Sequence, residues 1–337
     1  MKTARINYVD YAKAVGILLI VFAHCIQWFT PMSSINLFII SFHVPVFFIV
    51  SGCLACEKSI EDVPFITYLK KKSKSLLIPY IVFSLINSFL KLTVMKIDGS
   101  LTDEIVRNEM TELFITGNGT VWFLATLFFI YIAYYFIAKA FKNSLPLMFL
   151  ISACLLAIPY VFTKDQGKPF VTLILRFSGG LGYFILGYLL RKAMSLFSKK
   201  TLSYISGALL IAGVAVYLTL GSTFTFFDGT FRNPAGSLGS SILISFAIIV
   251  FFYSNGNYIR GKLHAVLEHF GKNSLVVMLA HPIILNCVTY PFGKTLNTFT
   301  GAAGVLLSLL LYVVVVAVSA VCSEFISKKM PWMLGKY

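Results

Sequence analysis

Ten apolar runs, each about as long as a helix that crosses a bilayer, constrain the fold of this chain more than any other feature. A hydrocarbon core about 30 Å thick takes about twenty helical residues, and charged residues, proline or glycine bound each run. We therefore expect an all-α polytopic membrane protein, a bundle of about ten transmembrane helices. The runs are Ala12 to Phe29, Asn36 to Cys56, Leu76 to Met95, Val121 to Ala138, Leu145 to Phe162, Phe177 to Leu190, Leu202 to Leu220, Ala235 to Tyr253, Asn273 to Tyr290 and Gly301 to Ile326.

The composition indicates the same class of protein. Hydrophobic residues make up 58% of the 337 and charged residues only 12%, whereas soluble proteins carry about 25% charged residues. The lipid bilayer must supply the apolar contact that a soluble globule would lack. The net charge is +15, but the basic residues are scattered in short clusters between the apolar runs. This scatter is typical of topology signals and headgroup contacts, and we expect no nucleic-acid partner.

Lysine and arginine are distributed unequally between alternate connections. The amino terminus, the even-numbered loops and the carboxyl tail hold 20 of them, and the odd-numbered loops hold 7. By the positive-inside rule, both termini face the cytoplasm. No segment between runs exceeds about 25 residues, so we expect one membrane domain over residues 1–337 and chemistry done by the bundle itself.

The six cysteines all fall in or near apolar runs, where a thiol behaves as a small hydrophobe. Cys53 and Cys56 form a CxxC without a second cysteine pair or a thioredoxin-like βαβ pattern. We expect no disulfide framework and a packing role for this pair.

Ionisable side chains within a span are costly, so each one is a hypothesis about function. Those inside runs are His24, His43, Lys91 and His281, and those at run edges are Asp10, Lys13 and Arg176. Lys91 lies within about a turn of the outer end of its run, where snorkelling toward the headgroups accounts for it.

His24 and His43 are predicted to share a depth in the bilayer. His24 lies about 18 Å along a helix that starts on the inner side, and His43 lies about 20 Å above that side on a helix running the other way. The short connection between the two runs makes them antiparallel neighbours. Histidine is the natural general base near neutral pH, although a buried histidine also serves as a hydrogen-bonding contact between helices.

Lys13 precedes His24 by eleven residues, which is about three turns, so both side chains are predicted on one helix face about 16 Å apart. A fixed positive charge below a titratable base suits an acyl-thioester carrier with phosphates at one end and a reactive carbonyl at the other. Alone, Lys13 is also an ordinary charge flanking the inner end of a span.

Six segments resemble motifs of the membrane acyltransferases called acyltransferase family 3, and they occur in the family's order over about Arg5 to Ile326. They are Arg5 to His24, Phe42 to Gly52, Lys74 to Tyr80, Val121 to Leu124, Tyr183 to Tyr188 and Gly271 to His281. In the first of them an Asp precedes a basic residue that is separated by ten residues from the catalytic His. Lys13 occupies a position where many relatives have Arg, and Lys binds phosphate as a point charge.

The resemblance implies transfer of an acyl group, most often acetyl, from cytoplasmic acyl-CoA to a carbohydrate hydroxyl on a bacterial surface glycan or its lipid-linked precursor. It implies a multi-pass protein of the bacterial cytoplasmic membrane, with acyl-CoA as cosubstrate and neither a bound cofactor nor a metal. His24 would be the catalytic residue and Lys13 its paired basic residue, contacting the donor. As site-lining or supporting residues it suggests Asp10, His43, Trp122, Arg176 and His281.

Two other classes of function are considered beside acyl transfer. A transporter or flippase of a lipid-linked sugar would use His24 and His43 as proton relays, but no internal repeat is visible and the runs contain few acids. A structural or signalling subunit gives no reason for the buried histidines. Direct transfer and an acyl-histidine intermediate both stay open, as do the acceptor and the oligomeric state.

Overall fold

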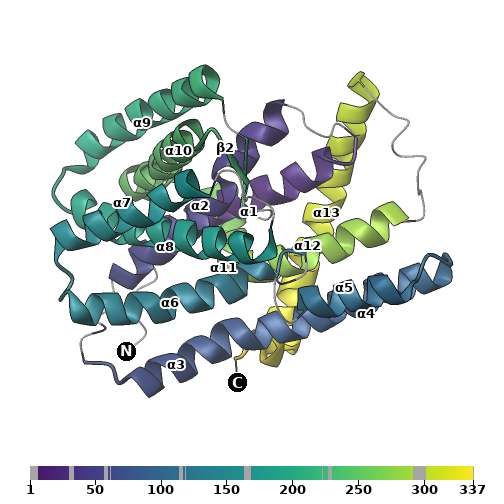
Figure 1. The fold of residues 1–337 in the computed structure, drawn as a ribbon. Coiled ribbons are helices and arrows are strands. Elements are labelled where there is room, and N and C mark those ends of the chain that lie inside the picture. The colour runs from purple at the N-terminus through teal and green to yellow at the C-terminus, as the bar shows by residue number, and fades with distance from the viewer. Residues whose placement is uncertain are drawn as a thin grey trace.

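The chain forms a helical bundle in the computed structural model (Figure 1). The structure describes residues 7–29, 34–56, 60, 62–113, 117, 119–162, 168–221, 223–226, 230–290 and 301–336. Its α-helices are α1 Asn7–Ile26, α2 Ser34–Cys56, α3 Phe65–Lys72, α4 Ile78–Ile97, α5 Asp103–Thr111, α6 Trp122–Ala140, α7 Leu145–Val161, α8 Pro169–Met194, α9 Lys199–Leu220, α10 Pro234–Asn255, α11 Gly261–Lys272, α12 Ser274–Thr289 and α13 Gly301–Lys329. Shorter turns are η1 Ser73–Leu77, η3 Gly256–Tyr258 and η5 Pro331–Leu334.

Each of the ten predicted apolar runs coincides with a helix. Among the described residues, eight helices are long and apolar enough to cross a membrane, and the bent pair of α11 and α12 gives up to nine. The helix of the fifth run, α7, is shorter than a full span. The chain is therefore a polytopic helical membrane protein, while the count of ten crossings and the cytoplasmic termini remain predictions.

Two helices begin well before the predicted starts. The third span is one 33-residue helical segment, Phe65–Ile97, so the lysines at 70, 71, 72 and 74 lie within it and not in a loop before it. Its π-helical turn η1 precedes Pro79, which has no N–H to donate, and a wider turn accommodates this loss. The sixth helix, α8, starts at Pro169 instead of Phe177.

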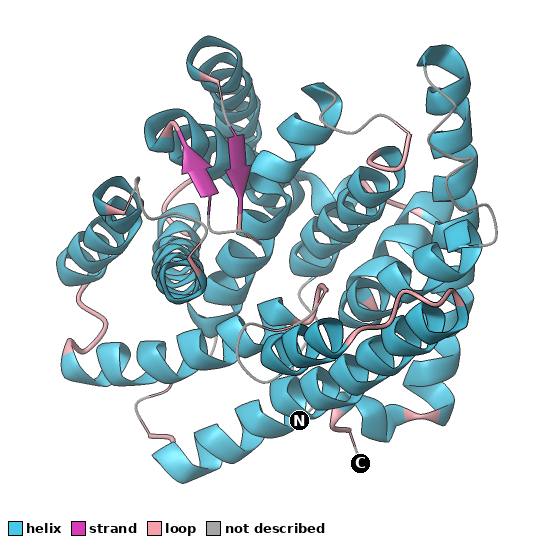
Figure 2. Cartoon of the chain, turned by 45° about the vertical axis from the view of Figure 1, so that its right-hand side comes forward, coloured by secondary structure: helices cyan, strands magenta, loops and turns pink. Residues whose placement is uncertain are grey.

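A short antiparallel hairpin interrupts the helical pattern, and no feature of the apolar runs predicted it (Figure 2). β1 Thr223–Thr225 pairs with β2 Thr230–Arg232, with Phe224 opposite Phe231. Phe226, which follows β1, is buried, and its ring centroid lies 5.5 Å from that of Phe48 in α2. The hairpin thus folds back onto the centre of the bundle.

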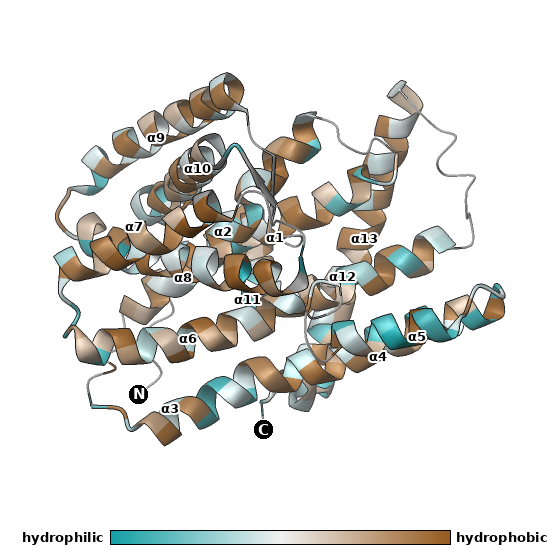
Figure 3. Ribbon diagram, viewed as in Figure 1, coloured by the Kyte–Doolittle hydropathy of each residue, from teal (hydrophilic) through white to brown (hydrophobic). Residues whose placement is uncertain are grey.

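The helices α1, α2 and α8 form the interior of the bundle. About 61–72% of the most apolar stretch of each is buried, against 17% for α9 and for α13. These last two lie at the periphery and are strongly apolar (Figures 1 and 3). Because apolar side chains at the periphery of a membrane bundle face lipid, we assign the outer faces of α9 and α13 to the bilayer.

The crossing of α2 and α8 is the tightest contact of the interior. Gly52 and Gly187 lie where each helix meets the backbone of the other, so an added Cβ at either would clash with a main-chain carbonyl. The thiol of Cys53 donates to the Gly187 carbonyl at 3.2 Å. The glycines at 180 and 182 lie inside α8 and admit side chains of neighbouring helices. Small residues thus set the spacing of the interior.

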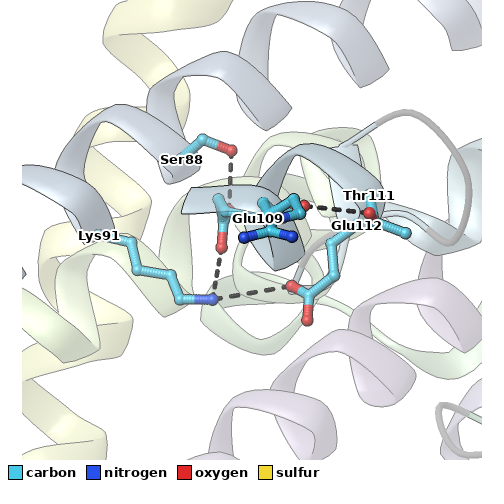
Figure 4. A network of polar contacts seen from close by, with 6 residues as sticks. Ser88, Lys91, Glu109, Thr111 and Glu112 are labelled. Atoms are coloured by element: carbon cyan, nitrogen blue, oxygen red, sulfur yellow. Dashed lines mark hydrogen bonds and ion pairs between the residues drawn. The ribbon is translucent and has the colours of Figure 1, made fainter. Parts of the chain in front are cut away.

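Lys91 has ion-pair partners that the snorkelling expectation did not include. Its ammonium donates to Glu109 at 2.5 Å and lies 3.7 Å from Glu112, because α5 folds back along α4 (Figure 4). Glu109 is buried and also accepts a hydrogen bond from Ser88 at 2.8 Å. The sequence reasoning considered Lys91 with its own helix alone, and its partner carboxylates lie in the next helix.

We predict that Gly187→Ala destabilises the protein by about 1–3 kcal/mol or more, because a backbone carbonyl cannot move aside for the new methyl group. The measurement is thermal unfolding of purified protein in detergent. Gly207→Ala in α9 is the matched control, since nothing lies within 4 Å of its added Cβ and alanine favours a helix interior over glycine. Equal melting temperatures for the two variants would contradict the close packing of α2 against α8 at Gly187.

We predict that Glu109→Gln lowers the free energy of local unfolding of α5 by about 1–3 kcal/mol. The substitution leaves a buried amide beside Lys91 in place of a carboxylate that pairs with its charge. Trypsin cleavage after the exposed Arg107 reports this local opening. Glu112→Gln is the control: this side chain is 46% exposed, so its loss changes stability by less than about 1 kcal/mol. An unchanged cleavage rate in Glu109→Gln would show that the ion pair does not hold α5.

Candidate active site

A cavity of about 370 Å³ lies between α1, α2, α6 and α12. His24 and His43 both line it, as the matched depth predicted, together with Trp122, Phe123 and Phe226. Its volume lies in the range of small-ligand sites, and its wall is mainly apolar and aromatic with few polar groups. His24 therefore faces a cavity within the protein.

His281 lies beside His24, although the two belong to the first and the twelfth helix. The ring centroids are 5.3 Å apart and the ring planes are tilted by 40°. The sequence placed His281 among the ionisable residues inside the runs and, through the family resemblance, among the site-lining candidates. The structure buries it completely and does not include it in the cavity wall.

Backbone carbonyls determine which ring nitrogen carries a hydrogen in two of the three imidazoles. His281 Nδ1 lies 2.9 Å from the Val277 carbonyl, and His43 Nδ1 lies 3.0 Å from the Ile39 carbonyl. Because a carbonyl oxygen only accepts, each Nδ1 carries a proton and donates. In the neutral form each Nε2 then presents a lone pair, and that of His281 is buried with no hydrogen-bond partner among the residues that the structure describes.

Thr120 joins the start of α6 to the helix that carries His281. Pro282 has no N–H for the Met278 carbonyl one turn earlier, and the Thr120 hydroxyl donates to that carbonyl at 2.8 Å. Thr120, Met278 and Pro282 all line the cavity. Sequence reasoning missed Thr120, and its only local signal was the proline that directly follows His281.

Arg176 supports the aromatic wall of the cavity. Its guanidinium lies 4.7 Å from the ring centroid of Trp122, and its Nε donates to the Phe226 carbonyl at 3.3 Å. The rings of Trp122 and Phe226 stack with centroids 6.3 Å apart. Arg176 was expected at a span edge, but the earlier start of α8 places it inside the helix, where it is 4% exposed. Sequence reasoning also missed Phe226, because it lies in the hairpin and outside any periodic segment.

Asp10 and Lys13 lie at the other end of α1 and do not line this cavity. The Lys13 ammonium forms an ion pair with Asp10 at 2.9 Å. Asp10 is buried, and the Lys13 side chain is 23% exposed. Arg5, which opens the same motif, lies outside the residues that the structure describes.

Within the described residues, no group of three or more His, Cys, Asp or Glu side chains is arranged to hold a metal ion. The site consists instead of His24 and His43 on the cavity, His281 beside His24, and an aromatic wall supported by a buried cation.

Comparison with known proteins agrees with the resemblance of the six motifs. Residues 6–324 match the family described as an acyltransferase domain, which is nearly the whole chain. No curated protein matches the chain. The extent of the family match, on a polytopic bundle with its histidines at a cavity, shows that the chain belongs to this acyltransferase domain family.

Proposed function

We propose that this membrane acyltransferase moves an acyl group, acetyl in the first instance, from cytoplasmic acyl-CoA to a hydroxyl of a cell-surface or lipid-linked carbohydrate. The observation that carries the proposal is the position of His24, on a cavity walled by aromatic rings within the bundle. We further propose the bacterial cytoplasmic membrane as its location. Membership of the family favours acyl transfer over the transporter alternative.

The chemistry needs one base and no redox step. A nitrogen of His24 takes the proton of the acceptor hydroxyl as the oxygen attacks the thioester carbonyl. The carbon–sulfur bond then breaks, and the thiolate leaves with the proton from His24. His24 thus returns to its starting state at the end of each transfer.

The aromatic wall suits a sugar acceptor. The apolar faces of sugar rings pack against aromatic side chains, and Trp122, Phe123 and Phe226 present such surfaces on one cavity. Polar groups in the same lining, Gln27 and Thr120 among them, are able to bond ring hydroxyls. Arg176 contacts both the Trp122 ring and the Phe226 carbonyl, and so supports the shape of this wall.

The Asp10–Lys13 pair is assigned to the donor side. It lies on α1 about 16 Å from His24, on the same helix face by the eleven-residue spacing. The arm between the diphosphate and the sulfur of coenzyme A has roughly the length of five extended residues, ~17 Å. A phosphate near Lys13 would therefore allow the thioester to reach His24.

We predict that His24→Ala lowers acyl transfer by about 10²- to 10⁴-fold, the range expected for loss of a general base. The measurement is the acetyl content of surface glycans, released by mild base and weighed by mass spectrometry, in cells that make each variant at equal abundance. His269→Ala, on α11 and outside the cavity lining, is the matched histidine control and should keep normal acetylation. Unchanged acetylation in His24→Ala would remove this residue from the mechanism.

We predict that Trp122→Ala raises the KM for the acceptor at least about tenfold and leaves the KM for acetyl-CoA within about twofold, because it removes an apolar contact surface worth roughly 1.5–3 kcal/mol. Trp122→Phe, which keeps a smaller ring, should fall between Ala and wild type. The assay uses purified protein, acetyl-CoA and a glycan extract from the producing cells. An effect confined to the KM of acetyl-CoA would move Trp122 to the donor side.

A further inference from the structure

A histidine base works best when its second nitrogen is held, because that bond fixes the tautomer and the direction of the reactive nitrogen. In the part of the chain that the structure describes, His24 forms no hydrogen bond or ion pair with a carboxylate. The His281 ring lies beside it, with the two ring centroids 5.3 Å apart. His281, on α12, is therefore the candidate for the residue that holds the His24 ring in place.

His281 has the properties that such a role needs. Its Nδ1–H is committed to the Val277 carbonyl, so its Nε2 carries the free lone pair. Among the described residues that nitrogen is fully buried and has no hydrogen-bond partner, a state that is rare in native proteins. The His24 ring lies beside it, with ring centroids 5.3 Å apart, and a bond between the two rings requires them to approach within hydrogen-bond distance.

His43 presents its Nε2 in the same way but differs in position. His43 lines the cavity, where a substrate reaches it, whereas His281 is absent from the cavity wall. The two neighbours of His24 are therefore not equivalent: one shares the cavity with the substrate, and the other is sealed in protein. Because His281 is outside the cavity wall, its Nε2 can accept a hydrogen bond from His24 without competition from water or substrate.

We infer that His281 is a positioning residue for His24: its Nε2 accepts a hydrogen bond from one N–H of His24, which leaves the other His24 nitrogen with its lone pair toward the cavity. This inference rests on the proposed function of His24. When that lone pair takes the acceptor proton, the positive charge of the imidazolium is stabilised by the bond to His281, and the proton then leaves with the thiolate. His281 itself gains no proton in the cycle.

Two substitutions separate this role from simple packing. His281→Phe keeps the ring and removes the acceptor, and His281→Gln places an amide oxygen where Nε2 was. With acetyl-CoA and glycan extract, we expect kcat to fall about 10- to 100-fold in His281→Phe, the usual effect of losing an orienting partner. The KM for acetyl-CoA should stay within about twofold, and His281→Gln should recover at least about a tenth of the wild-type kcat.

Wild-type kcat in His281→Phe would overturn the inference, and so would equal losses in the Phe and Gln variants. A Phe variant that fails to fold leaves the decision to Gln, which must then retain at least about a tenth of wild-type kcat.

A spectroscopic measurement tests the pairing without reference to acyl transfer. In protein labelled with ¹⁵N-histidine, we expect the His24 signal to report a single tautomer in wild type and a mixture of tautomers in His281→Phe, with His24→Ala used for assignment. If this change occurs but no variant or wild type transfers acetyl, the proposed function fails and the pairing stands. If transfer is intact and the His24 tautomer is the same in both proteins, the pairing is wrong.

Discussion

The demand that polar groups find partners inside the protein governs this structure. In the bilayer interior no water satisfies a free N–H or carbonyl, so the backbone forms helices and each buried polar side chain needs a neighbour. Several contacts follow from this demand: Lys91 meets the carboxylates of α5, Arg176 meets the Phe226 carbonyl and the face of Trp122, and the Thr120 hydroxyl meets the carbonyl that Pro282 leaves open. Among the described residues the Nε2 of His281 is buried with no partner, as are Asn87 Nδ2, Ser245 Oγ and Ser319 Oγ, and each such departure from the rule calls for an explanation.

The candidate site draws on helices that are distant in the sequence. The first helix supplies His24, the second supplies His43, and the twelfth supplies His281, while Trp122 and Arg176 come from α6 and α8. The close crossing of α2 and α8 at Gly52 and Gly187 brings these layers together. The cavity is thus a product of interior spacing, and the peripheral helices α9 and α13 shield the interior from lipid.

The apolar pattern located every one of the ten expected helices, because length and hydropathy decide what a bilayer accepts. It failed where a helix continues past charged residues, as in the basic turns before Pro79 and at Arg176 in α8, because a charge was taken as the boundary of a run. For the site, helix geometry predicted that His24 and His43 share a depth. It could not pair His24 with His281 or bring Phe226 into the wall, because contacts between segments so far apart leave no periodic trace in the sequence.

The Thr120 hydrogen bond has a mechanical consequence. It ties the segment ahead of α6 to the turn of α12 that ends in His281 and Pro282, across 158 residues of chain. A displacement of this segment would therefore be transmitted to the helix turn that carries His281, so the rim of the cavity and the position of His281 are mechanically linked.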